Sequence, residues 1–174
     1  CLQNLPVVLL VDRAGLVGSD GPTHHGAFDL SFLRTLPGLT VLAPYSLENL
    51  EEHLRQAVVS DRPVAIRYPR AGLPETLPDI LRTSEHPRVV LLGAGAMAQA
   101  AFEAATRLSA GGVAATACAL AGFKPLEEDR IRRAVAGAPW VVTVEENTVV
   151  GGFGSAVLEF LGREKIACRT LVLG

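Results

Sequence analysis

The sequence has 174 residues, of which 49% are hydrophobic and 20% charged, and its formal net charge at pH 7 is −2. This composition supports a buried core and excludes a disordered chain, and the lack of a basic cluster argues against a nucleic-acid-binding surface. No apolar run approaches the roughly 20 residues that a membrane-spanning helix needs, so we expect no membrane association. The cysteines at positions 1, 118 and 168 fit neither a metal-binding spacing nor a disulfide framework, which favours a reducing, cytoplasmic setting.

The two ends of the chain predict a piece of a longer protein. The chain starts at Cys1 rather than at a methionine, and it stops directly after the strand-like run 170–173. A strand left open at a terminus is typical of a domain from which neighbouring elements have been cut away. We therefore expect further sequence on both sides.

Strands and helices alternate in the first half of the chain. Strands are predicted at 6–11, 40–43 and 63–68. The first of them is apolar on both faces, which is typical of a strand covered on both sides in a parallel sheet. A loop rich in Gly, Asp, Pro and Thr follows it, from Asp12 to about Gly26.

Two helices are predicted between these strands. The first spans 28–36 and would place Phe28, Phe32 and Leu36 along one face. The second begins after Ser46, which is expected to cap the helix, with Asn49 standing three residues later. The apolar stripe predicted for the second helix consists of Leu47, Leu50, Leu54 and Val58.

A change in composition between residues 71 and 87 predicts a boundary between two units. Glycine and prolines interrupt a polar stretch there, and we interpret 76–85 as a semi-rigid linker.

A second series follows, with strands predicted at 88–92, 113–119, 140–144 and 167–173 and helices at 96–109, 127–136 and 152–161. Strand and helix alternate on both sides of the linker. The predicted fold class is therefore α/β, with two three-layer units (1–75 and 86–174) and mostly parallel sheets.

Polar side chains gather after the predicted strands of the first unit. Arg13 and Arg70 each lie two residues beyond a strand, and Asp20 and His24 lie four residues apart in the first loop. Open parallel sheets bind ligands outside the carboxyl ends of their strands. Two guanidinium groups at neighbouring strand ends match the oxygens of one phosphate, a histidine can move a proton near neutral pH, and an aspartate can orient a hydroxyl.

Each of these residues also has a purely structural interpretation. Arg13 can pair with Asp12 or Asp20 at the surface, and an arginine beside a linker often joins an ion pair between domains. The turn that begins at Asp20 can use its carboxylate to satisfy backbone donors. The adjacent His24 and His25 do not predict a metal site, because neighbouring residues rarely share a metal ion and no carboxylate or cysteine stands at ligand spacing. Both interpretations remain open at this point.

Two glycine-rich turns in the second unit invite ligand-binding interpretations. The run Gly93-Ala94-Gly95-Ala96-Met97-Ala98 matches a dinucleotide-binding fingerprint, but the acidic residue expected after the next strand is absent, which favours a tight turn with close packing. The run 151–155 suits an anion at a helix N-terminus, but Glu145 and Glu146 would repel one. We interpret both turns as structural.

Three neighbouring motifs carry a family resemblance: Asp12-Arg13-Ala14-Gly15-Leu16-Val17-Gly18, Asp20-Gly21-Pro22-Thr23-His24 and Gly26-Ala27-Phe28-Asp29-Leu30. They are similar to the signature of 1-deoxy-D-xylulose-5-phosphate synthases, and the Asp-Gly-x-Thr-His core recurs in transketolases. Further similarity lies at 43–44, 67–70, 123–126 and 144–155, so the resemblance covers essentially the whole chain in the expected order. His25 departs from the pattern, since relatives often carry Gln there.

The resemblance implies a thiamin diphosphate enzyme of three domains with a transketolase-like fold. Residues 1–75 would form the later part of the pyrimidine-binding domain and 86–174 most of the C-terminal domain. The domain that grips the diphosphate and Mg²⁺ would lie upstream of Cys1, together with the glutamate that activates the aminopyrimidine. Thiamin diphosphate and Mg²⁺ would therefore be held mainly by that upstream part, and no cofactor-binding or metal-binding residue is assigned within the chain. The resemblance also implies a homodimer.

The reaction implied by the resemblance joins pyruvate and D-glyceraldehyde 3-phosphate, with loss of carbon dioxide, to give 1-deoxy-D-xylulose 5-phosphate for isoprenoid, thiamin and pyridoxal synthesis. By the resemblance, Arg13 and Arg70 would bind the acceptor phosphate and Asp20 its hydroxyls, and His24 would contact the reacting carbonyl or the thiamin-bound intermediate. The alternatives are a transketolase, a 2-oxo acid dehydrogenase subunit or a non-catalytic module. The motifs at 12–15 and 68–70 favour the synthase, and the isolated chain is expected to be inactive.

Overall fold

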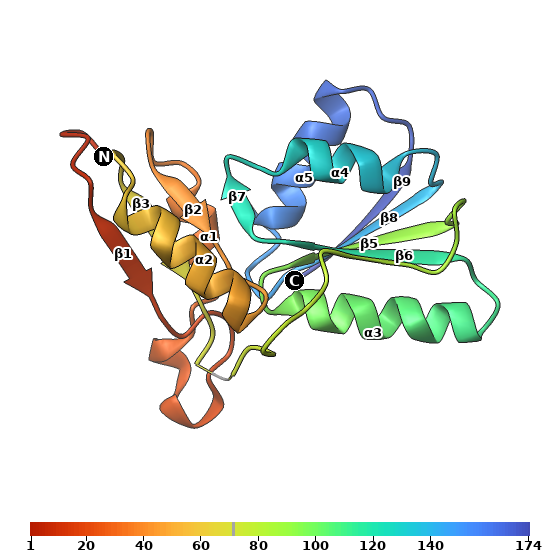
Figure 1. Cartoon of the computed structure of the whole chain (residues 1–174), viewed down its shortest axis with the longest axis horizontal. Helices are drawn as coiled ribbons and strands as arrows, with labels where there is room; N and C mark the ends of the chain where they lie inside the picture. The colour runs from red at the N-terminus through yellow and green to blue at the C-terminus, as the bar shows by residue number, and fades with distance from the viewer. Residues whose placement is uncertain (71) are drawn as a thin grey trace.

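The computed structural model describes residues 1–70 and 72–174, and it contains two β-sheets with helices packed against them (Figure 1). The strands are β1 (Val8–Val11), β2 (Thr40–Leu42), β3 (Val64–Arg67), β4 (Ile80–Arg82), β5 (Val89–Ala94), β6 (Ala115–Leu120), β7 (Gly122–Lys124), β8 (Trp140–Val144) and β9 (Arg169–Leu173). The α-helices are α1 (Asp29–Leu33), α2 (Leu47–Val58), α3 (Met97–Ala110), α4 (Glu128–Val135) and α5 (Phe153–Arg163), and two 3₁₀ turns, η1 (Gly18–Asp20) and η2 (Pro22–His24), lie in the first loop.

The first sheet has the strand order β1-β3-β2-β7. Strands β1, β3 and β2 are parallel, and β7 joins antiparallel to β2 although it belongs to the second half of the chain. Helix α2 covers one face through a small cluster centred on Ala57, Val64 and Ile66. The order places β1 directly beside β3, so the loops that leave these two strands emerge side by side.

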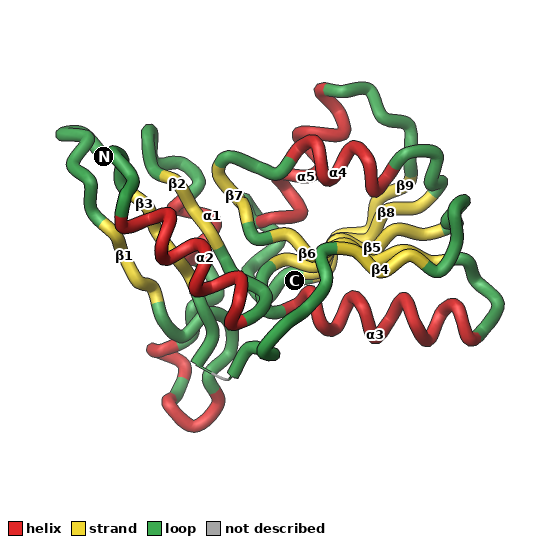
Figure 2. The backbone as a smooth tube through the Cα atoms, in the orientation of Figure 1, coloured by secondary structure: helices red, strands yellow, loops and turns green. Residues whose placement is uncertain are grey.

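The second sheet has the order β4-β6-β5-β8-β9 and forms the middle of three layers. Helix α3 lies on one side of it, and α4 and α5 lie on the other (Figures 1 and 2). Strands β6, β5, β8 and β9 are parallel, whereas β4 is antiparallel to β6.

The largest hydrophobic cluster joins the two halves. Leu30, Val41 and Ala65 from the first half pack in the same cluster as residues of α4, α5 and β7. At its centre the rings of Phe123 and Phe153 meet edge to face, with their centroids 5.3 Å apart. Because this core is continuous, the two sheets hold each other in place.

The predicted α/β fold with mostly parallel sheets is confirmed. Every predicted strand is present, and its bounds differ from the prediction by at most two residues at either end. The capping prediction is also confirmed, since the Asn49 N–H donates to Ser46 Oγ at 3.1 Å.

Two short strands escaped prediction from the sequence. Strand β4 lies inside the stretch 76–85 that was interpreted as a linker, and β7 lies in a segment without a predicted strand. Each has three residues and is antiparallel to its partner, so neither shows the long apolar run that marks a parallel strand. Residue 71, at the start of the segment 71–87 where the composition changes, lies outside the described residues.

Two predicted apolar faces are wrong, and a third is only partly buried. Phe28 and Phe32 are 66% and 57% exposed, while Leu30 and Leu33 of the same helix are buried. Strand β1 was expected to be covered on both faces, yet its Leu9 and Leu10 are exposed because β1 is at the sheet edge. Of the stripe predicted for α2, Leu50 packs against the cluster that contains Ala57, whereas Leu47, Leu54 and Val58 are exposed. In each case the pattern identified apolar residues but not the neighbour that covers them.

No helix among the described residues combines the length and the apolar character that crossing a membrane requires.

His53 on α2 is a half-buried histidine without a full set of hydrogen-bond partners among the described residues. Its ring is half-buried, and its Nδ1 atom has no hydrogen-bond partner among the described residues. Burial lowers the pKa of His53 below its ordinary value of 6.5, and the charge of Arg130 adds to this, while Glu127 and Glu52 oppose it.

We therefore expect the protein to lose stability in the pH range just below 6.5. The unfolded chain binds a proton at His53 more readily than the folded chain does, so the free energy of unfolding falls as the pH drops from 6.5 through the lower folded-state pKa. Urea unfolding at several pH values should show this loss in the unmodified protein and a smaller loss in His53→Gln. The exposed His86 supplies the control, since His86→Gln should keep the full pH dependence. Equal pH dependence in the unmodified protein and His53→Gln would contradict the assignment.

Candidate functional site

Three charged side chains meet where β1 and β3 end. Arg13 Nε lies 3.1 Å from Asp20 Oδ2, and Arg70 Nη1 lies 2.5 Å from Asp20 Oδ1. The two guanidinium groups thus hold one carboxylate between them, as they would hold another planar or tetrahedral anion. The predicted convergence of Arg13 and Arg70 is observed, and so is the surface pairing of Arg13 with Asp20 that was kept as its alternative.

A reciprocal pair of backbone hydrogen bonds closes the loop that carries Asp20. The Gly15 N–H donates to the Gly26 carbonyl at 3.1 Å, and the Gly26 N–H donates to the Gly15 carbonyl at 2.9 Å. Gly26 also donates to the Arg13 carbonyl at 3.1 Å, and a Cβ atom at position 26 would lie 2.5 Å from that oxygen. Glycine is therefore required at the base of the loop.

Arg13 has a left-handed backbone, with φ of 61°, which is uncommon for a residue other than glycine. The next residue, Ala14, donates its N–H to the carbonyl of Tyr68 at 3.0 Å, which ties the loop to the end of β3. Such a conformation costs about 1 kcal/mol or more and persists where its surroundings impose it. The left-handed conformation of Arg13 bends the chain at the start of the loop that carries Asp20.

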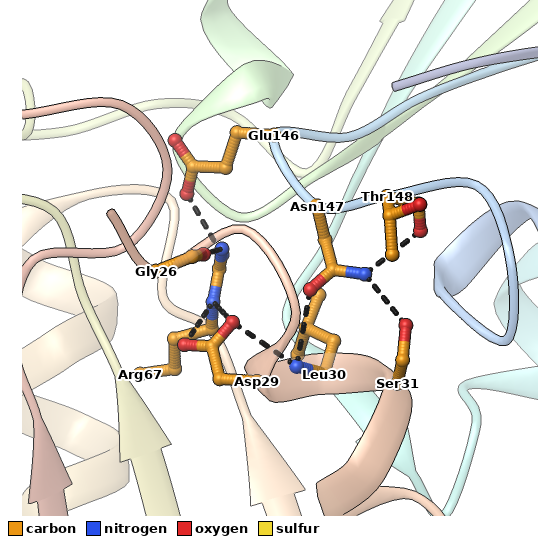
Figure 3. Close-up of polar contacts among 8 residues, drawn as sticks. All are labelled: Gly26, Asp29, Leu30, Ser31, Arg67, Glu146, Asn147 and Thr148. Atoms are coloured by element: carbon orange, nitrogen blue, oxygen red, sulfur yellow. Dashed lines mark hydrogen bonds and ion pairs between the residues drawn. The ribbon is translucent and has the colours of Figure 1, made fainter. Parts of the chain in front are cut away.

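A buried ion network lies directly beneath this loop (Figure 3). The Arg67 side chain is 1% exposed, and its Nε donates to both carboxylate oxygens of Asp29 at 2.9 and 2.8 Å. Its Nη1 donates to Glu146 Oε1 at 2.9 Å, and its Nη2 donates to the Gly26 carbonyl at 2.8 Å. Burial raises the pKa of Glu146, which the charge and the hydrogen bond of Arg67 partly offset.

Asn147 forms a second link between the halves next to this network (Figure 3). Its Oδ1 accepts the Leu30 N–H at 3.2 Å, and its Nδ2 donates to Ser31 Oγ at 2.9 Å and to the Thr148 carbonyl at 2.8 Å. The first turn of α1 is thus satisfied by a side chain from the other half of the molecule.

A cavity of about 450 Å³ opens beside the charged cluster. Residues from both halves line it, among them Ala14, Pro69 and Arg70 from the first half and Ala96 and Glu146 from the second. The volume is in the range of small-molecule sites. Arg70 therefore borders both the ion pair with Asp20 and an open space large enough for a small metabolite.

The two histidines of the loop have different surroundings. His24 is exposed on η2 with its Nδ1 3.3 Å from Thr23 Oγ1, and among the described residues it shares no hydrogen bond with Arg13, Asp20 or Arg70. The Nδ1 of His25 accepts the Val17 N–H at 3.1 Å and so braces the inside of the loop.

The glycine turn before α5 does hold an anion, but the chain itself supplies it. The Glu145 carboxylate accepts the N–H groups of Phe153 and Gly154 at 2.7 and 2.8 Å, with both partners buried. The turn is therefore structural, as predicted, because the Glu145 carboxylate itself occupies the helix N-terminus and leaves no room for an external anion. Burial raises the pKa of Glu145, and these two hydrogen bonds act against the rise.

The turn before α3 serves close packing, as predicted. A Cβ atom at Gly93 would lie 2.4 Å from the Cα of Ala98. The glycine therefore allows the helix to approach the end of β5.

The described residues do not fit a magnesium–diphosphate site. No group of three or more His, Cys, Asp or Glu side chains among them is placed to hold a metal ion. The N-terminus of α5, which follows a glycine-rich turn, is filled by Glu145.

Two residues that build the site, Arg67 and Asn147, were not singled out from the sequence, although their family motifs were identified. Glu146 was named only as a group that would repel an anion, not as a partner of Arg67. A charged residue as the last position of an otherwise apolar strand, as Arg67 is, was the one available signal. It marks a buried cation that requires partners.

Two domain families match the chain in consecutive segments. Residues 1–76 match the transketolase pyrimidine binding domain, and residues 79–171 match the transketolase C-terminal domain.

Individual relatives agree with these matches. The chain is 46% identical over 177 residues to 1-deoxy-D-xylulose-5-phosphate synthase 2 of Geobacter sulfurreducens, covering 95% of the chain and 28% of that protein. It is 42% identical to the synthase of Aquifex aeolicus, covering 99% of the chain and 29% of that protein. The chain thus spans less than a third of the length of these relatives.

Solved structures show the same fold. A split-gene transketolase, described as an inactive beta4 tetramer, superposes with a TM-score of 0.86 at 30% identity, covering 99% of the chain and 58% of that protein. A transketolase from Campylobacter jejuni superposes with a TM-score of 0.75 at 19% identity, covering 95% of the chain and 26% of that protein.

Replacing Arg67 should strongly destabilise the protein. Arg67→Met removes the cation and leaves the carboxylates of Asp29 and Glu146 buried without it, which costs about 3–5 kcal/mol of unfolding free energy. Urea unfolding at neutral pH measures the change. The control is Arg62→Met, since Arg62 and Asp61 are both exposed and their charges lie 3.9 Å apart, and the expected change is within about 0.5 kcal/mol. If the two substitutions changed the free energy of unfolding equally, the buried network would contribute no more to stability than an exposed ion pair.

Proposed function

Because the chain belongs to the transketolase family, carrying a pyrimidine-binding and a C-terminal domain, we propose that it is part of a thiamin-diphosphate-dependent 1-deoxy-D-xylulose-5-phosphate synthase. In the proposal, the whole protein condenses pyruvate with D-glyceraldehyde 3-phosphate, with loss of carbon dioxide, and thereby serves isoprenoid and thiamin biosynthesis. This segment supplies the site for the acceptor substrate. The observation that carries the proposal is the convergence of Arg13 and Arg70 on a single anionic group at the end of neighbouring strands.

The Asp20 carboxylate stands in for the substrate phosphate in this arrangement. Asp20 is held by hydrogen bonds from two arginine side chains that are 41% and 54% exposed, so water and ligands reach the pair. A phosphate carries more charge and more acceptor oxygens than a carboxylate and therefore competes well for the same donors. Released from the arginines, Asp20 is free to accept a hydrogen bond from a hydroxyl of the bound sugar.

His24 is assigned to the reacting carbonyl of the acceptor. It is exposed at the end of η2, within the same loop as Asp20, and so stands on the solvent side of the loop where a substrate arrives. An imidazole can donate a hydrogen bond or transfer a proton near neutral pH.

The cofactor side of the reaction belongs to the rest of the proposed protein. Thiamin diphosphate with Mg²⁺ would supply the carbanion chemistry, bound mainly by a part of the protein that precedes this segment, within a homodimeric assembly. The residues of this chain bind and orient the acceptor.

A second candidate is a non-catalytic module, and one solved relative favours it. The split-gene transketolase that covers 99% of the chain is described as inactive and as a tetramer. We propose that the 174 residues by themselves resemble it in being folded, able to associate and unable to turn over substrate. The two candidates are compatible, since one concerns the whole protein and the other the isolated segment.

The substitution Arg70→Ala should weaken the binding of the phosphorylated acceptor in the full-length protein. Loss of one charge-assisted contact to phosphate is worth about 1.5–3 kcal/mol, so KM for D-glyceraldehyde 3-phosphate should rise by about 10- to 150-fold. Steady-state kinetics with each substrate varied in turn measure this effect. KM for pyruvate should stay unchanged.

The acceptor D-glyceraldehyde, which lacks the phosphate, provides the control for this measurement. Arg70→Ala should leave its kinetics as they are, whereas His24→Ala should lower kcat with both acceptors because His24 is assigned to the carbonyl. If Arg70→Ala altered only the kinetics of pyruvate, the phosphate assignment would be wrong. An unchanged kcat in His24→Ala would remove His24 from the reaction.

The isolated 174-residue chain should form no product from pyruvate and D-glyceraldehyde 3-phosphate, with or without added thiamin diphosphate and Mg²⁺. The reason is that its described residues do not fit a magnesium–diphosphate site. A coupled assay for carbon dioxide release, run beside the full-length protein, tests this expectation. Measurable turnover by the purified chain would contradict it.

A further inference from the structure

The loop that carries Asp20 and His24 rests on a residue that also contacts the other half of the molecule. Gly15 and Gly26 close the loop through their backbone groups, and Arg67 Nη2 donates to the Gly26 carbonyl at 2.8 Å. The remaining donors of Arg67 are directed at Asp29, beside it in the first half, and at Glu146 in the second. The orientation of the guanidinium group therefore sets the position of the loop base.

Charge neutrality does not explain the presence of Glu146. Asp29 alone compensates the charge of Arg67, since both of its oxygens accept from Nε at 2.9 and 2.8 Å. Glu146 adds a second, part-buried carboxylate at the cost of desolvating it, and burial raises its pKa. Because burying the Glu146 carboxylate costs free energy and is not required to neutralise Arg67, we expect Glu146 to have a functional role.

Glu146 touches the site on two further sides. It lines the cavity of about 450 Å³ together with Arg70 and Ala14. It also lies against the loop base, because a Cβ atom at Gly15 would be 2.9 Å from Glu146 Oε2. Glu146 thus contacts the loop directly at Gly15 and indirectly, through Arg67, at Gly26.

A second ion pair also joins the two halves, but it lies away from the loop 15–26. Arg34 Nη2 lies 2.8 Å from Glu159 Oε2, and the Glu159 side chain is 66% exposed. Arg34 also donates to the carbonyls of Gly151 and Gly152, so its partners lie at α5 and not at the loop. The Arg34–Glu159 pair therefore serves as an internal control.

We propose that Glu146 is a positioning residue through which the C-terminal unit sets the loop 15–26, and with it the spacing of Asp20 and Arg13 from Arg70. Glu146 fixes the plane of the Arg67 guanidinium group, and Arg67 in turn holds the Gly26 carbonyl. The affinity of the arginine pair for a phosphate group thus depends on a carboxylate that does not touch the phosphate. This inference rests on the proposed function, in that it takes the arginine pair as the phosphate site.

Amide hydrogen exchange in the 174-residue chain tests the mechanical part of this inference. Glu146→Gln keeps the shape of the side chain and removes its charge. The Gly15 and Gly26 amides should then exchange about tenfold faster, the size expected when one charge-assisted hydrogen bond is weakened. Exchange in α3 should stay unchanged, and Glu159→Gln should leave the loop amides as they are. Glu146→Ala provides a second variant, and unchanged loop exchange in both Glu146 variants would overturn the inference.

Titration with inorganic phosphate tests the functional part. Glu146→Gln should bind phosphate about 5- to 10-fold more weakly than the unmodified chain, Arg70→Ala should lose most of the binding, and Glu159→Gln should change neither affinity nor melting temperature. In the full-length protein, Glu146→Gln should raise KM for D-glyceraldehyde 3-phosphate and leave KM for pyruvate unchanged, a split that general destabilisation would not produce.

The outcomes separate the two proposals. Equal phosphate binding by the unmodified chain and Arg70→Ala would overturn the phosphate site, and with it the proposed function. If Arg70→Ala lost binding while Glu146→Gln bound phosphate as tightly as the unmodified chain, the phosphate site would stand and the positioning role of Glu146 would be wrong.

Discussion

The burial of one guanidinium group constrains this structure more than any other interaction. Arg67 ends a central strand at a point where water does not reach its side chain, so every donor must find a protein acceptor. The acceptors come from three places: the start of α1, the base of the loop 15–26 and the segment after β8. The two units cannot separate, and the loop cannot move at its base, without exposing or stranding this charge.

The carboxylates of Glu145 and Asp20 each fill an anion-binding arrangement among the described residues, and the two arrangements differ in their donors. Glu145 is buried and held by backbone N–H groups of a helix that also needs them satisfied, so its site is part of the fold. Asp20 is held by side chains that are partly exposed and border a cavity. Side-chain donors in contact with solvent can exchange one anion for another, which is why the second site, and not the first, supports a function.

The sequence predicted the features that depend on neighbouring residues, and it missed those that depend on contacts between distant segments. Strands such as β8 were predicted because their apolar runs and breakers are local properties. The cap at Ser46 followed from its own side chain and a donor three residues away. By contrast, β4 and β7 exist because distant strands offer them hydrogen-bond partners, and Phe28 and Phe32 are exposed because the core reached α1 on its other side. Nothing local to these segments encodes either outcome.

The sequence by itself determined the family, the alternation of strands and helices, and the set of charged residues after the first strand, since each is written in a short run of residues. Only the tertiary structure decided that β1 lies beside β3, so that Arg13 and Arg70 reach the same carboxylate, and that Glu146 and Asn147 cross to the first unit. Strand order and contacts between units arise from pairing and burial across more than fifty residues of chain, which local chemistry does not specify.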